Sequence, residues 1–417
     1  MPGHKGKGEL ESLDITEITG ADSLFEADGI IAESERYASE IFGADTFYST
    51  EGSSLSIKAM LYLLCLYAAE KRERPFVLAA RNIHKSFVNA AALLDIDIAW
   101  IYGEGSSYLE CRITPDILEK RLSRLEKHPT ALYLTSPDYL GNIQDIQGLS
   151  EVCKKYGILL LCDNAHGAYL KFTTPSRHPI DLGADIVCDS AHKTLPVLTG
   201  GAYLHISRTA PAIFKERAKD ALALFGSTSP SYLILESLDR ANGSISDFNG
   251  FFEKAVDLRG KIAALGYTLC GDEPAKITIR AKKYGYEGKA LLKILESRGI
   301  ICEFADSDFL VLMLSPHNSD DDIERILNTL SAVEKKAEIT ALPPDVRPPD
   351  TAASPREAMF SPSEELPIES CVGRVFASSA LGCPPAVPIL VSGEVVSENA
   401  ISAFKYYGID KIRVKKA

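Results

Sequence analysis

The sequence predicts an α/β protein in which a mainly parallel β-sheet, covered by helices, forms a large domain that is followed by a smaller α+β domain. Two observations support this fold. Between residues 44 and 206, short apolar runs alternate with longer stretches of helical periodicity, which is the pattern of a parallel sheet with helical crossovers. The chain of 417 residues is also long enough for two or three domains, at about 150 residues each.

The expected elements follow one another along the first half of the chain. Short apolar runs bounded by polar residues predict strands. They span residues 76–80, 98–101, 131–135, 158–162, 186–189 and 202–206. Helical stretches between them span residues 54–71, 115–126 and 148–156. Gly157 follows the last of these, as is typical of a helix end. The order is that of a doubly wound α/β domain.

The second half of the chain has a different pattern. Residues 211–245 are predicted to be helical, and after them long helices surround shorter strands. The proline-rich stretch 341–360 is expected to be a linker. It leads to a short tail with a terminal helix. The expected domains are a large domain over 1–245, a small α+β domain over 246–340, and a linker with a C-terminal module over 341–417.

Composition and charge narrow the classes of function. The chain has 57 acidic and 45 basic side chains and a net charge of −12, which opposes binding to nucleic acid. Its longest apolar run, residues 59–69, is about half of what a bilayer crossing needs. We therefore expect a cytoplasmic protein. The nine cysteines are scattered without a CxxC pair, so we expect reduced core thiols and no metal site.

Polar residues directly after the expected strands are the first candidates for a site, because ligands of open α/β sheets bind beyond the carboxyl ends of the strands. In CDSAHKTL, Ser190, His192 and Lys193 follow such a strand. A lysine enclosed in a site can lose its proton and attack an aldehyde. A lysine taken at random is more often a solvated surface residue.

Two other strand ends carry groups suited to an aromatic ring. Asp163 comes directly after ILLLC, and His166 follows three residues later. A carboxylate at that position can keep a heterocyclic nitrogen protonated, although Asp also caps helices frequently. His84 follows the strand FVLAA. Its imidazole can stack on an aromatic cofactor or have a purely structural role.

A fourth group could bind an anion. Gly52, Ser53 and Ser54 lead into a helix, whose free amides and dipole attract a phosphate, although Gly-Ser-Ser is also an ordinary helix cap. A phosphate cradle, a stacking ring, an acid for a ring nitrogen and an amine for an aldehyde are together what pyridoxal phosphate needs. Asp163 precedes Lys193 with a strand between them, which matches the large domain of the aspartate aminotransferase superfamily, fold type I.

Longer motifs resemble a single family within that superfamily. They are MPGHKGKG, RNIHKSF, LTSPDYLGNIQDI, CDNAHGAYLKF, DSAHKTL and CVGRVFASSALGCPPAVPILVSGE. Together they resemble the Orn/Lys/Arg decarboxylase family, in particular its shorter bacterial members, from residue 2 to about residue 396. The resemblance implies a pyridoxal phosphate enzyme that converts arginine, lysine or ornithine to the amine and carbon dioxide, a reaction of polyamine biosynthesis.

The resemblance also implies a role for each candidate residue. Lys193 would bond covalently to the cofactor, Asp163 would pair with the pyridine nitrogen, and His84 would stack on the ring. The proton given to Cα would come from Lys193 or from His192. The further cofactor contacts are expected from Gly52, Ser53, Ser54, His166, Ser190 and His192.

The loop GSTSPSY implies an oligomer. Its Ser227 and Thr228 match a motif that, in relatives, reaches the phosphate of the neighbouring subunit. The active site would then require a homodimer, or a higher homo-oligomer with shared sites.

The chain departs from the family pattern at several positions. Asn164 and Tyr169 replace the acid and the second histidine of DEAHGAH, and Ala386 and Ser392 stand in the tail motifs PPGIP and PGE. The family normally carries a helical segment before PGHK, whereas this sequence starts on that motif.

Two alternative functions remain open at this point. An aminotransferase has the same fold and lysine, and Arg280 would then bind the α-carboxylate. A catalytically impaired binding or regulatory protein stays open because of the altered DNAHGAY segment, although the intact Lys193, Asp163 and His84 argue against it. The acid that meets the cation of the substrate side chain is also open, with Glu51 and Glu369 as candidates.

Overall fold

The computed structural model describes residues 3–9, 11–243, 248, 250–378 and 386–416. The expected domain boundary at residues 245 and 246 lies outside the described residues, and so does Cys383. The chain forms two compact units that are each discontinuous in sequence. The first comprises residues 1–103, 113–136 and 144–246, and the second comprises residues 104–112, 137–143 and 247–417.

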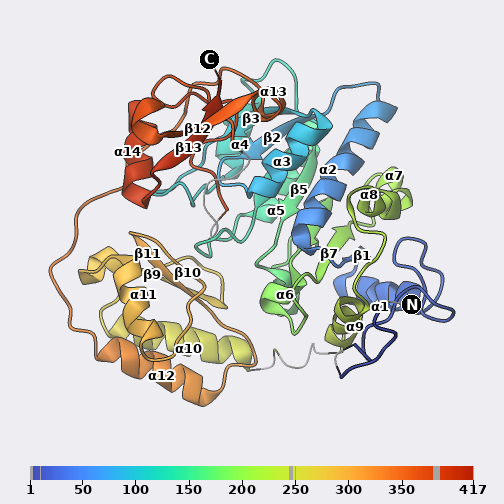
Figure 1. Cartoon of the computed structure of the whole chain (residues 1–417), viewed down its shortest axis with the longest axis horizontal. Coiled ribbons are helices and arrows are strands. Elements are labelled where there is room, and N and C mark those ends of the chain that lie inside the picture. The colour runs from blue at the N-terminus through green and yellow to red at the C-terminus, as the bar shows by residue number, and fades with distance from the viewer. Residues whose placement is uncertain (1–2, 10, 244–247, 249, 379–385, 417) are drawn as a thin grey trace. The chain divides into compact units, whose positions relative to one another are not determined.

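A seven-stranded sheet forms the centre of the first unit (Figure 1). Its strands lie in the order β1-β7-β6-β5-β4-β2-β3. Strands β2 to β6 are parallel to one another, whereas β7 is antiparallel to both β6 and β1. The mainly parallel sheet confirms the predicted fold class. The strands are β1 (Asp45–Ser49), β2 (Phe76–Ala80), β3 (Asp97–Ile101), β4 (Ala131–Thr135), β5 (Leu159–Asp163), β6 (Ile186–Asp189) and β7 (Ala202–Ile206).

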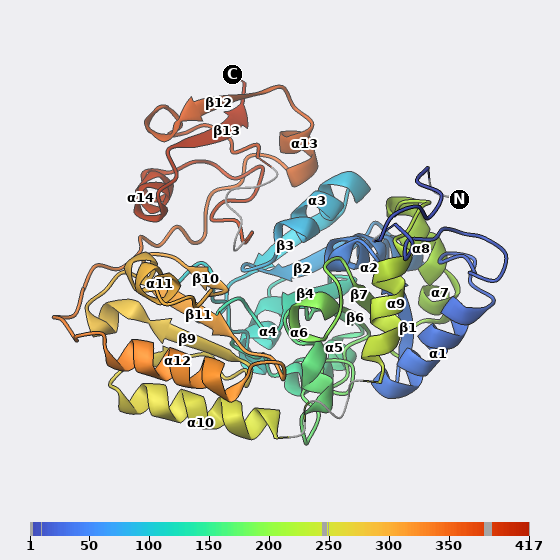
Figure 2. The same ribbon diagram turned by 60° about the horizontal axis from the view of Figure 1, so that its bottom comes forward.

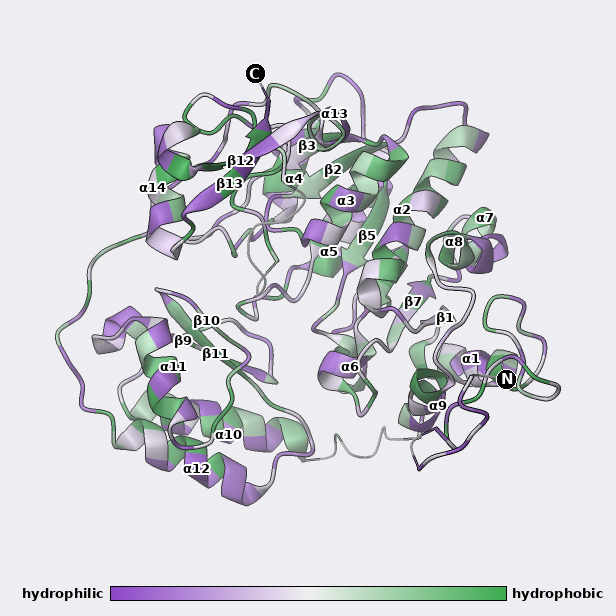
Figure 3. Cartoon of the chain, viewed as in Figure 1, coloured by the Kyte–Doolittle hydropathy of each residue, from purple (hydrophilic) through white to green (hydrophobic). Residues whose placement is uncertain are grey.

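Helices lie on both sides of this sheet. Figure 2 shows α2 and α3 on one side and α4 and α5 on the other. Strand β2 is hydrophobic along its length and β5 is hydrophobic up to Cys162, as expected of strands buried between helices (Figure 3). The helices of this unit are α1 (Ile30–Phe42), α2 (Gly52–Glu70), α3 (Lys85–Leu94), α4 (Pro115–Leu122), α5 (Ile146–Tyr156), α6 (Ala191–Thr194), α7 (Ala212–Glu216), α8 (Ala218–Phe225) and α9 (Tyr232–Ala241), with a 3₁₀ helix at Ala168–Phe172.

Helix α2 is a core helix. Its 19 residues are long and apolar enough by composition alone to cross a membrane. In the structure it packs on β6 and β7 and against α3 and α8, and Leu61, Leu63 and Leu64 on it are fully buried. Its apolar composition is therefore accounted for by the protein core.

Two sequence expectations for helices are wrong. Residues 211–245 do not form one helix but the three helices α7, α8 and α9. The break between α8 and α9 follows Gly226 and includes Pro230, which lacks the amide proton that a helix interior needs. Helix α4 ends at Leu122 rather than at residue 126. Helices α1 and α3 and strand β1 were not among the elements for which bounds were predicted.

The second unit contains a four-stranded antiparallel sheet in the order β10-β11-β9-β8. Helices α10 and α12 lie against each other beside it (Figures 1 and 2). The elements are α10 (Phe251–Ala264), β8 (Leu269–Cys270), β9 (Lys276–Arg280), α11 (Gly288–Glu296), β10 (Phe304–Ala305), β11 (Phe309–Met313) and α12 (Asp320–Ser331), with a 3₁₀ helix at Ala281–Tyr284.

The C-terminal part of this unit has its own apolar cluster, which includes Phe376, Leu390 and Phe404. The stretch 341–360, expected to be a linker, contains a short helix, and a strand follows the expected terminal helix. The elements are α13 (Pro355–Met359), β12 (Ser363–Pro367), a 3₁₀ helix at Ile368–Ser370, α14 (Glu398–Tyr407) and β13 (Lys411–Lys415), and β12 pairs with β13.

The two departures in the tail motifs have different local consequences. Ala386 has a φ of 56°, in the left-handed region where the glycine of PPGIP has no steric cost. The Ser392 hydroxyl donates to the carbonyl of Ser378 at 2.7 Å, a bond that a proline at this position cannot make.

Candidate active site

The predicted anion cradle lies at the beginning of α2. Gly52 has a φ of 72°, and a Cβ placed on it would meet no atom within 4 Å, so the space beside this helix end is open. Its amide donates to the Gly200 carbonyl at 2.7 Å. The Ser190 hydroxyl donates to the Ser53 hydroxyl at 2.7 Å. The structure therefore brings residues of the α2 start together with the end of β6 and the loop before β7.

His84 is held in one orientation by its surroundings. It is the N-cap of α3, and its Nδ1 accepts the Ser86 amide at 3.2 Å and lies 2.9 Å from the Ser86 hydroxyl. The Ser54 hydroxyl lies 2.8 Å from that of Ser86, which links the ring to the anion cradle. Burial, and then the charges of Lys193 and Lys85, lower the pKa of His84 to about 4. His84 is therefore a neutral, fixed imidazole at neutral pH.

Asp163 is the last residue of β5 rather than a helix cap. It is 2% exposed. Burial raises the pKa of Asp163, while the charge of Lys193 and the hydrogen bond from the Ala165 amide act in the opposite direction. The Tyr133 hydroxyl lies at 3.5 Å from Oδ2. A cationic N–H partner stabilises the charged form of a buried carboxylate such as Asp163. A protonated pyridine nitrogen is a partner of this kind.

Lys193 lies on α6, the short helix after β6. Its Nζ is 3.0 Å from Nε2 of His166, which follows β5 and is 4% exposed. His192, next to Lys193 in sequence, has its Nδ1 at 3.0 Å from the Gly201 carbonyl. The two histidines therefore have different surroundings: His166 lies against the lysine amine, and one ring nitrogen of His192 is engaged by the backbone.

The loop with Ser227 and Thr228 lies beside the anion cradle of its own chain. The Ser227 amide donates to Oε1 of Glu51 at 2.5 Å, and Glu51 is the residue before the first turn of α2. The side chains of Ser227 and Thr228 are exposed. Both are therefore accessible at this edge of the first unit.

A buried hydrogen-bond network, which sequence reasoning missed, lies behind Asp163. Asp189, at the end of β6, accepts from Nε2 of His178 at 2.9 Å and of His205 at 3.1 Å, and from the Asn164 amide at 2.6 Å. Burial alone would raise the pKa of Asp189, but the two imidazoles hold it below its ordinary value. Burial lowers the pKa of His205.

These three groups, His178, Asp189 and His205, have the spacing of metal ligands. Their hydrogen bonds are complete without an ion, however. Nδ1 of His178 accepts the Ile180 amide, so its Nε2 carries the proton that it donates to Asp189. Nδ1 of His205 lies 2.9 Å from the Thr46 hydroxyl. The cluster is therefore a structural network that supports the strand ends next to Asp163.

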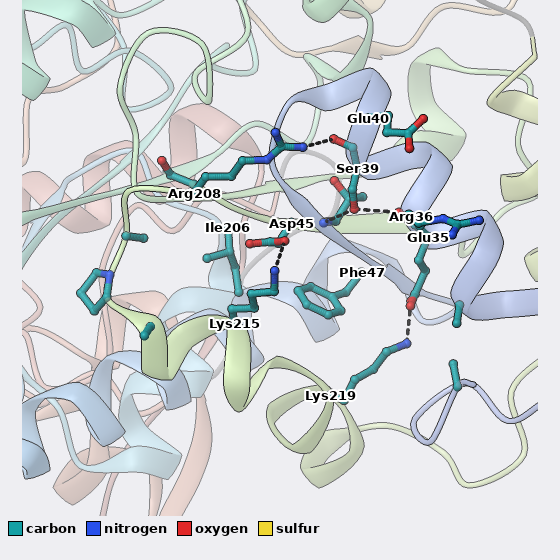
Figure 4. Close-up of a pocket in the computed structure, with 17 residues that line it drawn as sticks. Glu35, Arg36, Ser39, Glu40, Asp45, Phe47, Ile206, Arg208, Lys215 and Lys219 are labelled. Carbon is teal, nitrogen blue, oxygen red and sulfur yellow. Dashed lines mark hydrogen bonds and ion pairs between the residues drawn. The ribbon is translucent and has the colours of Figure 1, made fainter. Parts of the chain in front are cut away.

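A separate pocket of about 840 Å³ lies between α1, the beginning of β1 and the helices α7 and α8 (Figure 4). Its lining includes the ion pairs Lys215–Asp45 at 2.7 Å and Lys219–Glu35 at 2.6 Å. The pocket is at the opposite end of β1 from the anion cradle. Of the candidate site residues named above, none lines this pocket.

Comparison with known proteins assigns the family. The profile of the Orn/Lys/Arg decarboxylase major domain matches residues 6–263, and that of the C-terminal domain of the same family matches residues 335–411. The chain belongs to the Orn/Lys/Arg decarboxylase family. The resemblance predicted from the sequence is thereby confirmed, and with it the enzyme class of the family, an amino acid decarboxylase.

Individual relatives of this decarboxylase cover most of the chain. The uncharacterised protein YaaO of Bacillus subtilis is 30% identical, over 94% of this chain and 85% of its own length. An arginine decarboxylase of the same organism is 28% identical, over 96% and 88% respectively. The crystal structure of the lysine decarboxylase LdcF of Francisella novicida matches with a TM-score of 0.78 at 16% identity, over 100% of this chain and 78% of that chain. This structural likeness confirms the fold type I class.

Proposed function

We propose that this chain is a pyridoxal phosphate-dependent decarboxylase that converts arginine, lysine or ornithine to the corresponding amine and carbon dioxide. The position of Lys193 carries the proposal. After burial, the charge of Lys193 is the largest influence on the pKa of both Asp163 and His84. The amine is therefore near enough to the acid and to the imidazole to influence the charge of each, and these three groups would suit an aldehyde cofactor with a protonated ring nitrogen.

Each side chain has a distinct part in holding the cofactor. The Lys193 amine would bond to the aldehyde, Asp163 would accept the ring N–H, and the fixed imidazole of His84 would stack on the ring. The phosphate would lie at the start of α2, where the space beside Gly52 is open and the Ser53 hydroxyl could donate to it. The family resemblance assigns further residues to the phosphate, namely Ser54, Ser190, His192, Ser227 and Thr228. It assigns His166 to the cofactor site.

When bound, this cofactor accepts the electron pair that departing carbon dioxide leaves behind. The residues of the chain would orient the cofactor and supply protons to the ring nitrogen and to Cα. Asp163 keeps the ring nitrogen protonated, because its buried carboxylate is stabilised by a cationic partner. Lys193, or His192 beside it, would return a proton to Cα.

The contacts of Arg280 favour decarboxylation over transamination. In the second unit, one guanidinium nitrogen of Arg280 lies 3.3 Å from Oε1 of Glu110, and the group lies over the ring of Phe309. An arginine that is neutralised by a neighbouring carboxylate is poorly suited to clamp the α-carboxylate of a substrate. The impaired alternative is weakened because Asn164 has its own structural partner in Asp189 and leaves Asp163 in place.

The remaining expectations belong to the same proposal. The enzyme would act in the cytoplasm on a small-molecule amino acid, as a homodimer or higher homo-oligomer. Of the two acids considered for recognition of the substrate side chain, Glu369 is paired with Lys405 at 3.1 Å and Glu51 accepts the Ser227 amide. Neither contact singles out one of them.

A product assay with three substrates tests the function. Purified enzyme supplied with pyridoxal phosphate is incubated with arginine, lysine or ornithine, and carbon dioxide, amine and keto acid are measured. We expect equimolar carbon dioxide and amine with at least one substrate, with arginine first because of the 28% identical relative. Lys193→Ala should lose activity by several orders of magnitude and fail to form an absorbance band with the cofactor. Keto acid as the main product, or a Lys193→Ala variant as active as the wild type, would contradict the proposal.

A further inference from the structure

The Lys193 amine lies beside a base that the family resemblance assigned only to cofactor binding. Nζ of Lys193 and Nε2 of His166 are 3.0 Å apart, a hydrogen-bond distance. His166 is 4% exposed, so its ring has little freedom to turn away. A proton can therefore pass directly between these two nitrogens without an intervening water molecule.

The neighbouring groups are less suited to take this proton. Nδ1 of His192 is hydrogen-bonded to the Gly201 carbonyl at 3.0 Å. Nδ1 of His84 accepts the Ser86 amide at 3.2 Å and lies 2.9 Å from the Ser86 hydroxyl, so this nitrogen is already engaged. Asp163 would accept the N–H of the cofactor's pyridine ring. His166 is the imidazole that lies in direct contact with the Lys193 amine.

We infer that His166 is the base that takes the proton from the Lys193 ammonium and later returns it, and that His192 does not have this part. The inference rests on the proposed function. In the forward step the Nζ–H bond of Lys193 breaks, its electron pair stays on Nζ, and the proton moves to Nε2 of His166. The free amine would then bond to the aldehyde carbon, and the aldehyde oxygen would leave as water. When the amine is released again, the proton returns along the same hydrogen bond.

Several charged groups face this pair and influence when it titrates. Asp163 on β5 and His84 before α3 both respond to the charge of Lys193, and Lys85 adds a positive charge next to His84. His192 is adjacent on α6. A pH profile has to be interpreted as that of the whole group, so the comparison between variants, rather than a single midpoint, tests the inference.

The test measures how fast Lys193 bonds to pyridoxal phosphate, which needs no substrate turnover. Cofactor-free protein is mixed with pyridoxal phosphate in a stopped-flow instrument, the absorbance change is followed between pH 5 and 9, and borohydride reduction with peptide mapping verifies attachment at Lys193. In wild type the rate should fall toward acidic pH, where an imidazole takes up a proton and can no longer accept one from the lysine. In His166→Gln the rate should be about a hundredfold lower at pH 7.5, and this acidic fall should be absent.

The control variants separate His166 from other histidines. His192→Gln should keep the acidic fall of the rate. His317→Gln, at an exposed position on the second unit, should match the wild type in every measurement. Lys193→Ala should show no covalent attachment. If His166→Gln does not fold by circular dichroism, His166→Ala with added imidazole provides a second route, because imidazole should restore part of the attachment rate.

Two outcomes contradict the inference and a third concerns the proposed function. A rate and pH profile of His166→Gln equal to those of the wild type would overturn it, and so would loss of the acidic fall in His192→Gln alone. A wild-type protein that forms no lysine-linked chromophore with pyridoxal phosphate would instead overturn the proposed function. Attachment that depends on His166 in an enzyme that yields keto acid would leave the inference standing and change only the reaction.

Discussion

At the residue scale, Asn164 shows how one substitution in a family motif is coupled to its neighbours. The family pattern has an acid at this position. Here the Asn164 amide donates to Oδ1 of Asp189 at 2.6 Å, while Oδ2 of Asp189 accepts from His178 and His205. All four side chains are fully buried. An acid at position 164 would therefore place two carboxylates at hydrogen-bond distance without water between them.

This coupling predicts a strong effect of Asn164→Asp on stability. We expect the free energy of unfolding to fall by about 3 kcal/mol at pH 8, because a hydrogen bond is replaced by buried like-charge repulsion. Burial and Asp189 would raise the folded-state pKa of the new carboxyl above its unfolded value. The penalty should therefore grow as the pH rises above about 4 and be smaller at pH 5 than at pH 8. Urea unfolding at the two pH values measures it.

The double variant Asn164→Asp with Asp189→Asn is the matched control. It restores a carboxylate-amide pair with the roles exchanged, and the amide oxygen introduced at position 189 can still accept from the two imidazoles. We expect it to recover part of the lost stability. Equal stability of Asn164→Asp and the wild type at pH 8 would show that the contact with Asp189 has no energetic weight.

Individual candidate site residues can be predicted from the sequence more readily than the contacts between them. Asp163, His84 and Lys193 could be singled out because each follows an apolar strand, and strand ends are recognisable locally. The hydrogen bond between Lys193 and His166 could not be predicted, because it depends on the rotamers of two side chains that are 27 residues apart in sequence. The partners of Asp189 were missed for the same reason, since His178 and His205 come from outside the motifs.

At the element scale, strands of the buried sheet were predictable because each is a short run of apolar residues. β2, β4, β6 and β7 have the predicted bounds, β3 begins one residue earlier than predicted, and β5 is shifted by one residue. Strand β1, DTFYS, was missed because its five residues mix polar and aromatic side chains. It is an edge strand that pairs with β7 only, and this pairing with a distant part of the sequence has no local signal.

Helix α1 and helix α8 are joined at β1 by a buried ion pair. Oε1 of Glu35 on α1 accepts from Nζ of Lys219 on α8 at 2.6 Å and from the amide of Tyr48 on β1 at 2.9 Å (Figure 4 shows the lysine contact). The side chains of Glu35 and Lys219 are 8% and 21% exposed. Burial raises the pKa of Glu35, and Lys219 opposes that rise.

Removing the lysine should destabilise the fold at neutral pH. For Lys219→Met we expect a loss of about 3 kcal/mol in the free energy of unfolding, because the Glu35 carboxylate remains buried without its cation. The folded-state pKa of Glu35 would lie still further above its unfolded value. The loss should therefore be larger at pH 8 than at pH 5, where part of the carboxyl is protonated. Chemical denaturation at both pH values checks this.

Lys215→Met is a control from the same pocket. Lys215 pairs with Asp45 at 2.7 Å, but its side chain is 64% exposed. A pair of this kind contributes less than about 1 kcal/mol. Equal effects of Lys215→Met and Lys219→Met would show that burial does not distinguish the two pairs.

At the scale of the whole molecule, local sequence patterns do not predict which segments of the chain belong to each of the two compact units. Residues 104–112 and 137–143 lie between elements of the seven-stranded sheet in sequence but belong to the second unit. Two side chains of β9 hold the second of these segments there. Nζ of Lys276 donates to the Asp138 carbonyl, and the Thr278 hydroxyl donates to the Leu140 carbonyl. The predicted boundaries at 245 and 340 stay predictions, because apolar patterning along the chain carries no record of such long-range contacts.

The loop with Ser227 and Thr228 leads to a prediction about the oligomer. Its position would decide whether the active site is completed by the same chain or by the neighbouring subunit. If the loop reaches the phosphate of the neighbouring subunit, Lys193→Ala and the double variant Ser227→Ala/Thr228→Ala should complement each other on co-expression. A mixed dimer would then have one intact site, so the decarboxylase activity should reach about a quarter of the wild-type value. The contact of Ser227 with Glu51 of its own chain allows the opposite arrangement. In that case the mixture should be no more active than the sum of the separate variants, and affinity-tagged mixed dimers, isolated and assayed alone, distinguish the two results.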